Sequence, residues 1–364
     1  MVECVQDVDF CVIWRYKLVM GVTIKDVARL SGVGIATVSR VLNNSGISSN
    51  ETKEKVMAAV RELNYVPNNN ARSLRMVQSK TIALLVKGIT NPFFQKMIHT
   101  IEQKVFLRGY HLEIRNVNYS DHEMSMAIKE VQDRNLNGII LMGGNFEYTN
   151  EDFNRLGVPC VLLTVAAGKD VDESLYSSVI VDDEAESYKA TEYLINLGHR
   201  RIGCIYSTVG NIVTPNRLRF GGYKKALEAN GIAFDPVLIS SINVSESGYE
   251  FGFNMMKNLI SRNKDMTAVV TMADTMAIGA AKAAISAGLR VPEDMSIIGF
   301  DGIEVAEYYN PSLDTICQPA EQMSVGAIDA LFEMLQGGKT SHLVYEASLL
   351  KRGSCASRNR SSII

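Results

Sequence analysis

The sequence predicts two parts: a small all-α helix-turn-helix module and a larger α/β body of two parallel-sheet subdomains. Three short amphipathic helical segments follow one another within residues 23–64, and strand-like and helix-like segments then alternate in two successive sets. The length, 364 residues, is too great for one ordinary core and agrees with several domains. Hydrophobic residues make up 46% and charged residues 21%, as in globular proteins, and no apolar run predicts a membrane span.

The charge of the chain is unevenly distributed. Residues 22–80 hold nine Lys/Arg against four Asp/Glu, whereas the remainder holds 28 against 36. A basic module attached to an acidic body indicates an anionic partner for the N-terminal module.

Several common site patterns are absent from the sequence. The six cysteines show no CxxC spacing, which argues against a zinc site or a disulfide framework and agrees with a reducing cytoplasm. The five histidines show no HExxH spacing, and neither GxSxG nor a P-loop occurs. We therefore expect no metal, no cofactor and no enzymatic activity. Residues 1–19 do not resemble a secretory signal, and we interpret Met20 as the natural start, with an ordered N-terminal element as the alternative.

Three helices account for the N-terminal module. Thr23 can cap a helix over Ile24–Ser31, with Asp26 completing a T-x-x-D capping box. A second helix is expected over about Ile35–Asn43 and a third over about Asn50–Asn64. Their apolar positions are Ile24, Val27, Ala28, Val38, Val41, Leu42, Val56, Ala59, Val60 and Leu63. This pattern is typical of a helix-turn-helix, although periodicity alone fits a three-helix bundle without a ligand equally well.

The body shows the βαβ pattern twice. Strands are predicted over residues 81–87, 110–116, 137–143, 158–164 and 177–182, and then over 201–207, 236–240, 267–272 and 295–300. Helices are predicted over 92–108, 122–135 and 148–156, and then over 184–197, 215–230, 246–261 and 274–287. Parallel sheets bind ligands beyond the C-terminal ends of their strands, so a ligand cleft is expected between the two subdomains.

The N-terminal module resembles the DNA-binding headpiece of the lactose-repressor (LacI/GalR) family. The resemblance is carried by TIKDVARLSGVGIATVSRVLNN at residues 23–44 and ETKEKVMAAVRELNYVPNNNARSLR at residues 51–75. It implies DNA contacts by Thr23, Ile35, Ala36, Thr37, Ser39 and Arg40. By the same resemblance, Ile35, Ala36 and Arg40 contact the bases. The guanidinium of Arg40 can donate to O6 and N7 of a guanine. Gly34 departs from the serine usual in the family, which removes one phosphate contact.

The polar segment after Pro67 resembles the hinge of the same family. Its string NNNARSLR would be a flexible linker on composition alone. The resemblance implies that it folds into a helix on DNA, that Asn68, Ala71 and Leu74 contact the DNA, and that Leu74 wedges a base step in the minor groove.

The body resembles the family's effector domain, which is similar to periplasmic sugar-binding proteins. The matching segments include NPFF at residues 91–94, RLRFGGY at 217–223 and VPEDMSIIGFD at 291–301. The resemblance implies an effector held by Phe93, Thr164, Arg219, Asn243 and Asp301. Ala273 and Asn243 depart from the asparagine and the stacking aromatic found in many members. The default effector is a sugar or sugar phosphate.

These observations lead to one organisation and one function. We expect an extension over 1–20, a headpiece over 21–66, a hinge over 67–80, subdomains over 81–181 plus 318–345 and 182–317 plus 346–357, and a tail over 358–364. The chain is interpreted as a cytoplasmic homodimeric regulator that binds palindromic double-stranded operator DNA under the control of a small molecule. The alternatives are a regulator whose corepressor is a phosphorylated carrier protein, and a sugar-binding transport protein.

Overall fold

The computed structural model describes residues 23–42, 49–63, 80–118, 121–208, 212–243 and 248–358. The chain divides into two compact units, residues 1–77 and 78–364, which are described separately. The proposed start at Met20 and the hinge residues Asn68, Ala71 and Leu74 lie outside the described residues. Within the described ranges, no helix is long and apolar enough to cross a membrane.

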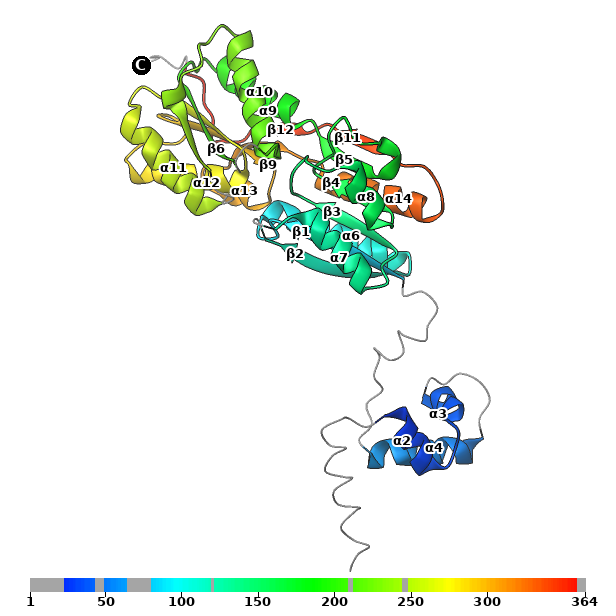
Figure 1. The fold of residues 1–364 in the computed structure, drawn as a ribbon. Coiled ribbons are helices and arrows are strands. Elements are labelled where there is room, and N and C mark those ends of the chain that lie inside the picture. The colour runs from blue at the N-terminus through cyan, green and yellow to red at the C-terminus, as the bar shows by residue number, and fades with distance from the viewer. Residues whose placement is uncertain are drawn as a thin grey trace, which may run out of the picture. The chain divides into compact units, whose positions relative to one another are not determined.

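The N-terminal unit contains the three predicted helices. They are α2 (Ile24–Ser31), α3 (Ile35–Leu42) and α4 (Asn50–Glu62), and they appear in blue in Figure 1. Their shared core consists of Val27, Ala28, Val38, Val56 and Ala59. The other predicted apolar positions, including Val41 and Leu63, are only half-buried around this core, because so small a module cannot cover them fully.

Local sequence signals set the boundaries of these helices. The backbone nitrogen and the hydroxyl of Thr23 donate to Oδ2 of Asp26 at 3.1 and 2.7 Å, as the capping box predicted. Gly32 ends α2 with a φ of 68°, a left-handed conformation that glycine adopts without steric cost. The Ser49 hydroxyl caps α4 by accepting from the backbone nitrogen of Thr52.

The first subdomain of the body is built on a parallel six-stranded sheet with the order β11-β5-β4-β3-β1-β2. Its strands are β1 (Thr81–Lys87), β2 (His111–Val117), β3 (Gly138–Met142), β4 (Cys160–Leu163), β5 (Ser177–Val181) and β11 (His342–Tyr345). Its helices are α6 (Pro92–Leu107), α7 (Glu123–Asp133), α8 (Asn150–Leu156) and α14 (Ala320–Leu335). Helices α6 and α14 pack on one face and α7 and α8 on the other, so both faces of the sheet are buried.

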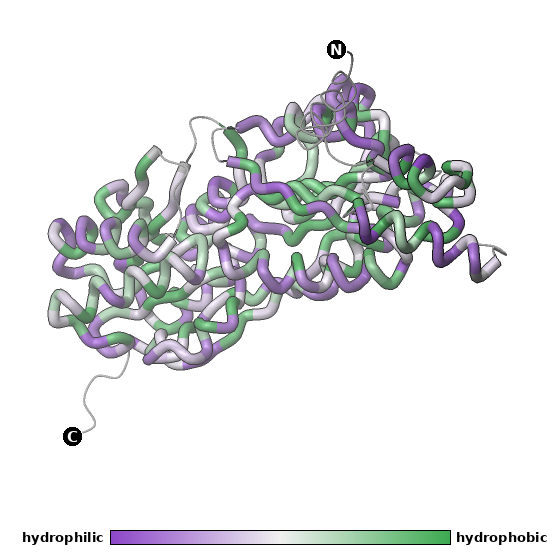
Figure 2. The backbone as a smooth tube through the Cα atoms, turned by 90° about the horizontal axis from the view of Figure 1, so that it is seen from below, coloured by the Kyte–Doolittle hydropathy of each residue, from purple (hydrophilic) through white to green (hydrophobic). Residues whose placement is uncertain are grey.

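The second subdomain has a six-stranded sheet with the order β12-β10-β9-β8-β6-β7, in which only β12 is antiparallel. Its strands are β6 (Ile202–Thr208), β7 (Ile239–Asn243), β8 (Ala268–Thr271), β9 (Ser296–Asp301), β10 (Asp314–Cys317) and β12 (Ser348–Leu350). Its helices are α9 (Asp183–Asn196), α10 (Pro215–Ala229), α11 (Tyr249–Arg262), α12 (Asp274–Ser286) and α13 (Val305–Tyr308). In Figure 2 the strands are mostly hydrophobic, whereas the surrounding helices alternate in hydropathy. This difference is expected, because the helices cover both faces of the sheets and have one face toward the strands and one toward solvent.

The chain passes between the sheets in three places. It leaves the first sheet after β5, returns to it between β10 and α14, and crosses again between β11 and β12. The last crossing puts an edge strand on each sheet. Just beyond β12, the buried Ser354 hydroxyl donates to the carbonyl oxygen of Ile297, and its backbone nitrogen donates to Asp314 at 2.9 Å.

The sequence prediction was wrong in some local details. Pro236–Leu238 form a short 3-10 helix, and the strand predicted from residue 236 begins at Ile239. Proline has no N–H for the sheet ladder, which explains the late start. The helices predicted to begin at about His122 and Tyr148 begin one and two residues later, at Glu123 and Asn150, after their N-caps. The elements α13, β10, α14, β11 and β12 were not predicted.

Candidate nucleic-acid interface and effector cavity

Helix α3 presents the side chains predicted to read bases. Ala36 and Arg40 are exposed one turn apart, while Val38 on the opposite face is buried. Nε of Arg40 donates to the carbonyl oxygen of Ala36 at 3.3 Å, and within the described part of the headpiece no hydrogen bond engages its two terminal nitrogens. Ile35 is half-buried against the headpiece core, so only part of its side chain is available for contact. Thr23 is exposed, and Thr37 and Ser39 are half-buried.

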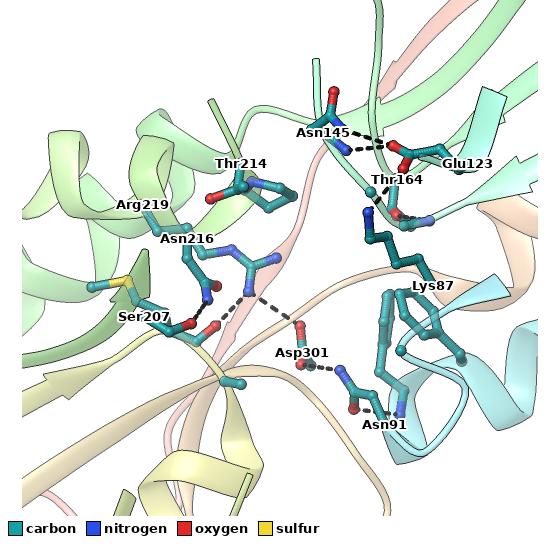
Figure 3. Close-up of a pocket in the computed structure, with 18 of the residues that line it drawn as sticks. Lys87, Asn91, Glu123, Asn145, Thr164, Ser207, Thr214, Asn216, Arg219 and Asp301 are labelled. Atoms are coloured by element: carbon teal, nitrogen blue, oxygen red, sulfur yellow. Dashed lines mark hydrogen bonds and ion pairs between the residues drawn. The ribbon is translucent and has the colours of Figure 1, made fainter. Parts of the chain in front are cut away.

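A cavity of about 340 Å³ lies at the C-terminal ends of strands from both sheets of the body. Lys87, Thr164 and Asp301 come from or directly follow β1, β4 and β9. Figure 3 shows Lys87 and Glu123 on one side of the cavity and Arg219 and Asn216 on the other. The cavity is therefore the cleft between subdomains that the βαβ pattern predicted.

Four of the five predicted effector residues line this cavity. They are Phe93, Thr164, Arg219 and Asp301. Phe94 lines the cavity as well, although only Phe93 was predicted to face the ligand. Asn243 is the last residue of β7, and its side chain lies outside what the structure describes.

Arg219 and Asp301 form the centre of one wall. Nη1 of Arg219 lies 3.4 Å from Oδ1 of Asp301, and Nε of Arg219 donates to Oδ1 of Asp183 at 2.7 Å. The guanidinium also lies over the Phe300 ring, with its carbon 3.7 Å from the ring centroid. These contacts fix the plane of the guanidinium at the edge of the cavity, where Figure 3 shows Arg219 beside Asp301.

Asp301 is held by residues from distant parts of the chain. Its Oδ1 accepts from Nε2 of Gln318 at 2.9 Å, and its Oδ2 accepts from Nδ2 of Asn91 at 3.5 Å. Its φ of 114° is unfavourable for a residue with a side chain, and Thr164 across the cavity has a φ of 69°. Two such residues at one cavity agree with the concentration of backbone strain at functional sites.

Burial raises the pKa values of the carboxyl groups in and behind this wall. It raises the pKa of Asp301 to about 6, against the opposing effect of Arg219. It also raises the pKa of Asp274 to about 8, and the negative charge of Asp301 adds to that rise. The pKa of Asp183 is raised by burial as well, despite its contact with Arg219. The carboxyl groups behind the wall therefore take up protons more readily than exposed ones.

The opposite wall is organised around the buried carboxylate of Glu123. Nζ of Lys87 lies 2.9 Å from Oε2 of Glu123 and also donates to the carbonyl oxygen of Asp121. Oε1 of Glu123 accepts from the backbone nitrogen and the side-chain amide of Asn145 and from the Tyr148 hydroxyl. This network fixes Lys87 at the cavity in a partly desolvated position.

Several cavity residues were missed by the sequence analysis. They are Lys87, Asn91, Glu123, Asn145, Ser207, Thr214, Asn216 and Gln318. Lys87 ends β1, Ser207 lies at the end of β6, and Asn145 and Gln318 follow β3 and β10. The rule that ligands meet parallel strands at their C-terminal ends could have identified these four, whereas Glu123 begins a helix and carries no such signal.

Two family models match this chain. Residues 23–68 match the model described as bacterial regulatory proteins, lacI family, and residues 191–355 match a periplasmic binding protein-like domain. The chain is 38% identical over 335 residues to the HTH-type transcriptional regulator MalR of Clostridium butyricum, covering 91% of this chain and 98% of that protein. It is 33% identical over 323 residues to the ribose operon repressor of Escherichia coli strain K12, covering 86% of this chain and 93% of the repressor.

Solved structures agree with these matches. The lac repressor dimer bound to operator and the anti-inducer ONPF is 27% identical with a TM-score of 0.69, covering 92% of this chain and 99% of that chain. A complex of the transcriptional regulator CelR with cellobiose is 29% identical with a TM-score of 0.67, covering 92% and 100%. The headpiece, the two-sheet body and the extent of these matches together show that the chain belongs to the LacI family of DNA-binding transcriptional regulators.

Proposed function

We propose that this chain represses transcription by binding a palindromic operator as a homodimer, and that a sugar in the body cavity controls this binding. The observation that carries the proposal is the pairing of Arg219 and Asp301 at a cavity between two sheets, in a chain that also has a helix-turn-helix headpiece. A guanidinium donates hydrogen bonds and a carboxylate accepts them, so the pair suits the hydroxyl groups of a sugar.

The exposed face of α3 supports the DNA-binding part of the proposal. Arg40 is exposed, no hydrogen bond among the described headpiece residues engages its terminal nitrogens, and Ala36 beside it offers a small apolar surface for a thymine methyl. Thr23, Thr37 and Ser39 would contact phosphates, which position the helix without reading sequence. In the hinge, Asn68, Ala71 and Leu74 would contact the minor groove.

Named relatives support a sugar as the effector. Solved relatives include the CelR complex with cellobiose and a LacI-family regulator from Enterococcus faecium with bound ribose, which is 26% identical with a TM-score of 0.66. Two further relatives are named ribose operon repressors. In this chain, Asn145, Asn216 and Gln318 add uncharged polar groups to the cavity, and Phe93 and Phe94 add apolar surface. That combination suits a ring with a polar edge and an apolar face.

Exposed apolar side chains on the body support a homodimer. Phe106 and Leu107 at the end of α6 are 76% and 75% exposed, and Tyr308 in α13 is 77% exposed. Large apolar side chains of this exposure commonly mark protein contacts. A dimer would also supply the two headpieces that a palindromic site requires.

Binding of the full chain to DNA tests the proposal. Operators selected from a random library should be palindromic, and fluorescence anisotropy should show one dimer bound to each. Adding ribose, glucose, maltose and cellobiose separately should change the operator affinity for at least one sugar, while a scrambled duplex gives no such change. Selection of sites without two-fold symmetry, or unchanged affinity with every sugar, would contradict the corresponding part of the proposal.

A further inference from the structure

We infer that the effector of this chain is uncharged, and that Asp183, which lies behind Arg219, makes the cavity discriminate against phosphorylated and carboxylated sugars. The inference rests on the proposed function, because it concerns the ligand of the same cavity. It follows from how the charges around the cavity are paired.

The wall of the second subdomain holds more negative than positive groups. Among the described residues that line this wall, Arg219 is the one cation, and it contacts the carboxylates of both Asp183 and Asp301. These two carboxylates are each only 3% exposed, so water screens them weakly. The positive charge of Arg219 is therefore already balanced before a ligand arrives.

The wall of the first subdomain is balanced in a similar way. Lys87 is paired with Glu123 at 2.9 Å, and Glu123 is 2% exposed. His122 also lines the cavity but is exposed to solvent, where its interactions are screened. Among the described residues, each lysine and arginine that lines the cavity thus has a buried carboxylate partner. An anionic ligand would have to enter without an unpaired buried cation to neutralise it.

The groups that remain available suit a hydroxyl. No hydrogen bond among the described residues engages Nη2 of Arg219, and Figure 3 shows this nitrogen directed into the cavity. Among the described residues, Oδ2 of Asp301 accepts only the long 3.5 Å bond from Asn91. One neighbouring donor and one neighbouring acceptor can bind a hydroxyl, which both accepts and donates. A phosphate or carboxylate group can satisfy the donor, but it is repelled by the acceptor.

Asp183 is the residue through which this selectivity can be tested. It does not line the cavity, and it acts through its 2.7 Å contact with Nε of Arg219. Removing its charge leaves the lining side chains in place and leaves Arg219 with one carboxylate partner. The raised pKa values of Asp183, Asp274 and Asp301 agree with a dry region that already resists further negative charge.

The experiment uses the full chain and matched pairs of ligands. Calorimetry compares ribose with ribose 5-phosphate, glucose with glucose 6-phosphate, and cellobiose with cellobiose 6-phosphate, and inorganic phosphate is measured alone. For every neutral sugar that binds, we expect its phosphate to bind at least about tenfold more weakly, because an added charge meets nearby carboxylates in a weakly screened site. A phosphorylated sugar that binds as tightly as its parent, or inorganic phosphate that binds the cavity of the unmodified protein, would overturn the inference.

The variant Asp183→Asn keeps the size of the side chain and removes its charge. It should improve the affinity for a phosphorylated sugar relative to its parent by about tenfold, whereas a structural role would weaken both ligands equally. Asp182→Asn is the matched control, since Asp182 is adjacent but exposed, and it should leave the ratio unchanged. If Asp183→Asn does not fold, the ligand pairs with the unmodified protein still decide the inference. If no neutral sugar binds, the sugar part of the proposed function fails, and the phosphate measurement still tests the charge argument.

Discussion

Asn91 and Asp301 are 210 positions apart in the chain, and Nδ2 of Asn91 lies 3.5 Å from Oδ2 of Asp301. Asn91 caps α6 on the first sheet, and Asp301 ends β9 on the second sheet. Their hydrogen bond therefore connects the two subdomains at the carboxylate proposed to bind the effector. Occupation of Asp301 by a sugar would compete with this bond, which links ligand binding to the separation of the subdomains.

Asn91→Ser tests this link. Serine keeps a cap for α6 but is too short to reach Asp301, so the unfolding midpoint should change little. The ratio of operator affinities with and without the sugar should change severalfold if sugar binding separates the sheets, because the bond at 3.5 Å would then be lost. Anisotropy titrations at saturating and zero sugar measure the ratio. An unchanged ratio would show that the contact does not contribute to coupling.

Asp301→Asn tests whether Asp301 binds the effector. Asparagine tolerates the positive φ of this position better than alanine and has nearly the same shape. The variant should lose the response to the effector while its operator affinity stays within about twofold, since the headpiece is unchanged. Asp265→Asn, an exposed carboxylate on the same subdomain, serves as control. A normal response in Asp301→Asn would assign this residue a purely structural role.

Effector affinity should depend on pH through Asp301. A hydroxyl that donates to Asp301 favours its ionised form, so sugar binding should lower the pKa of this group from about 6. The affinity for the sugar should be highest above pH 7 and should fall by up to about tenfold per pH unit below about pH 6. The groups close to Asp301 are Arg219, Asp183, Asp274, Gln318 and Asn91.

Calorimetry between pH 5 and 8 measures this dependence. His122 also lines the cavity, so His122→Gln is the necessary control. The pH dependence should persist in that variant. A pH-independent affinity in His122→Gln would contradict the assignment of the pH dependence to Asp301.

Arg40→Ala tests base reading by α3. The variant should lose about 1–3 kcal/mol on the selected operator and should relax the preference at one base pair. Arg61→Ala, which removes an exposed arginine from α4, should have a smaller effect. Competition between selected and scrambled duplexes measures specificity, and equal losses on both would indicate that Arg40 contacts only the DNA backbone.

Leu74→Ala tests the proposed hinge. If Leu74 wedges a base step, the variant should lose on the order of 1–3 kcal/mol of specific affinity per subunit, the scale of burying a leucine side chain. DNA bending in a circular-permutation gel should decrease, and sugar binding should not change. Normal bending together with normal affinity would identify residues 68–75 as a simple tether.

The features that could be predicted from the sequence depend on local signals. The capping box of Thr23 and Asp26 and the buried run of β1 are set by residues a few positions apart, and both were predicted. Arg219 and Asp301 could be placed at the cleft because they occur in matching family segments, one of them at a strand end. The contact of Arg219 with Asp183 could not, because it joins residues on two different helices, 36 positions apart.

The missed elements have a different cause. Strands β11 and β12 contain four and three residues, which is too short to show a period. Each is defined by its pairing with a strand far away in the sequence, as in the pairing of His342 with Ser178. Lys87 and Glu123 were missed for the same reason, since their ion pair spans 36 positions.

The three crossings between the sheets have a consequence for synthesis of the protein. The edge strand β11 completes one sheet and β12 completes the other, and both come from the last part of the described chain. Ser354, which ties that part to Ile297 and Asp314, follows them. A nascent chain on the ribosome can fold its headpiece early, but the first sheet lacks its edge strand until Tyr345 has emerged, and the second lacks its edge strand until Leu350 has emerged. Chains truncated before residue 342 should therefore expose two open sheet edges at once and should be removed by proteolysis, even though their DNA-reading helices are intact.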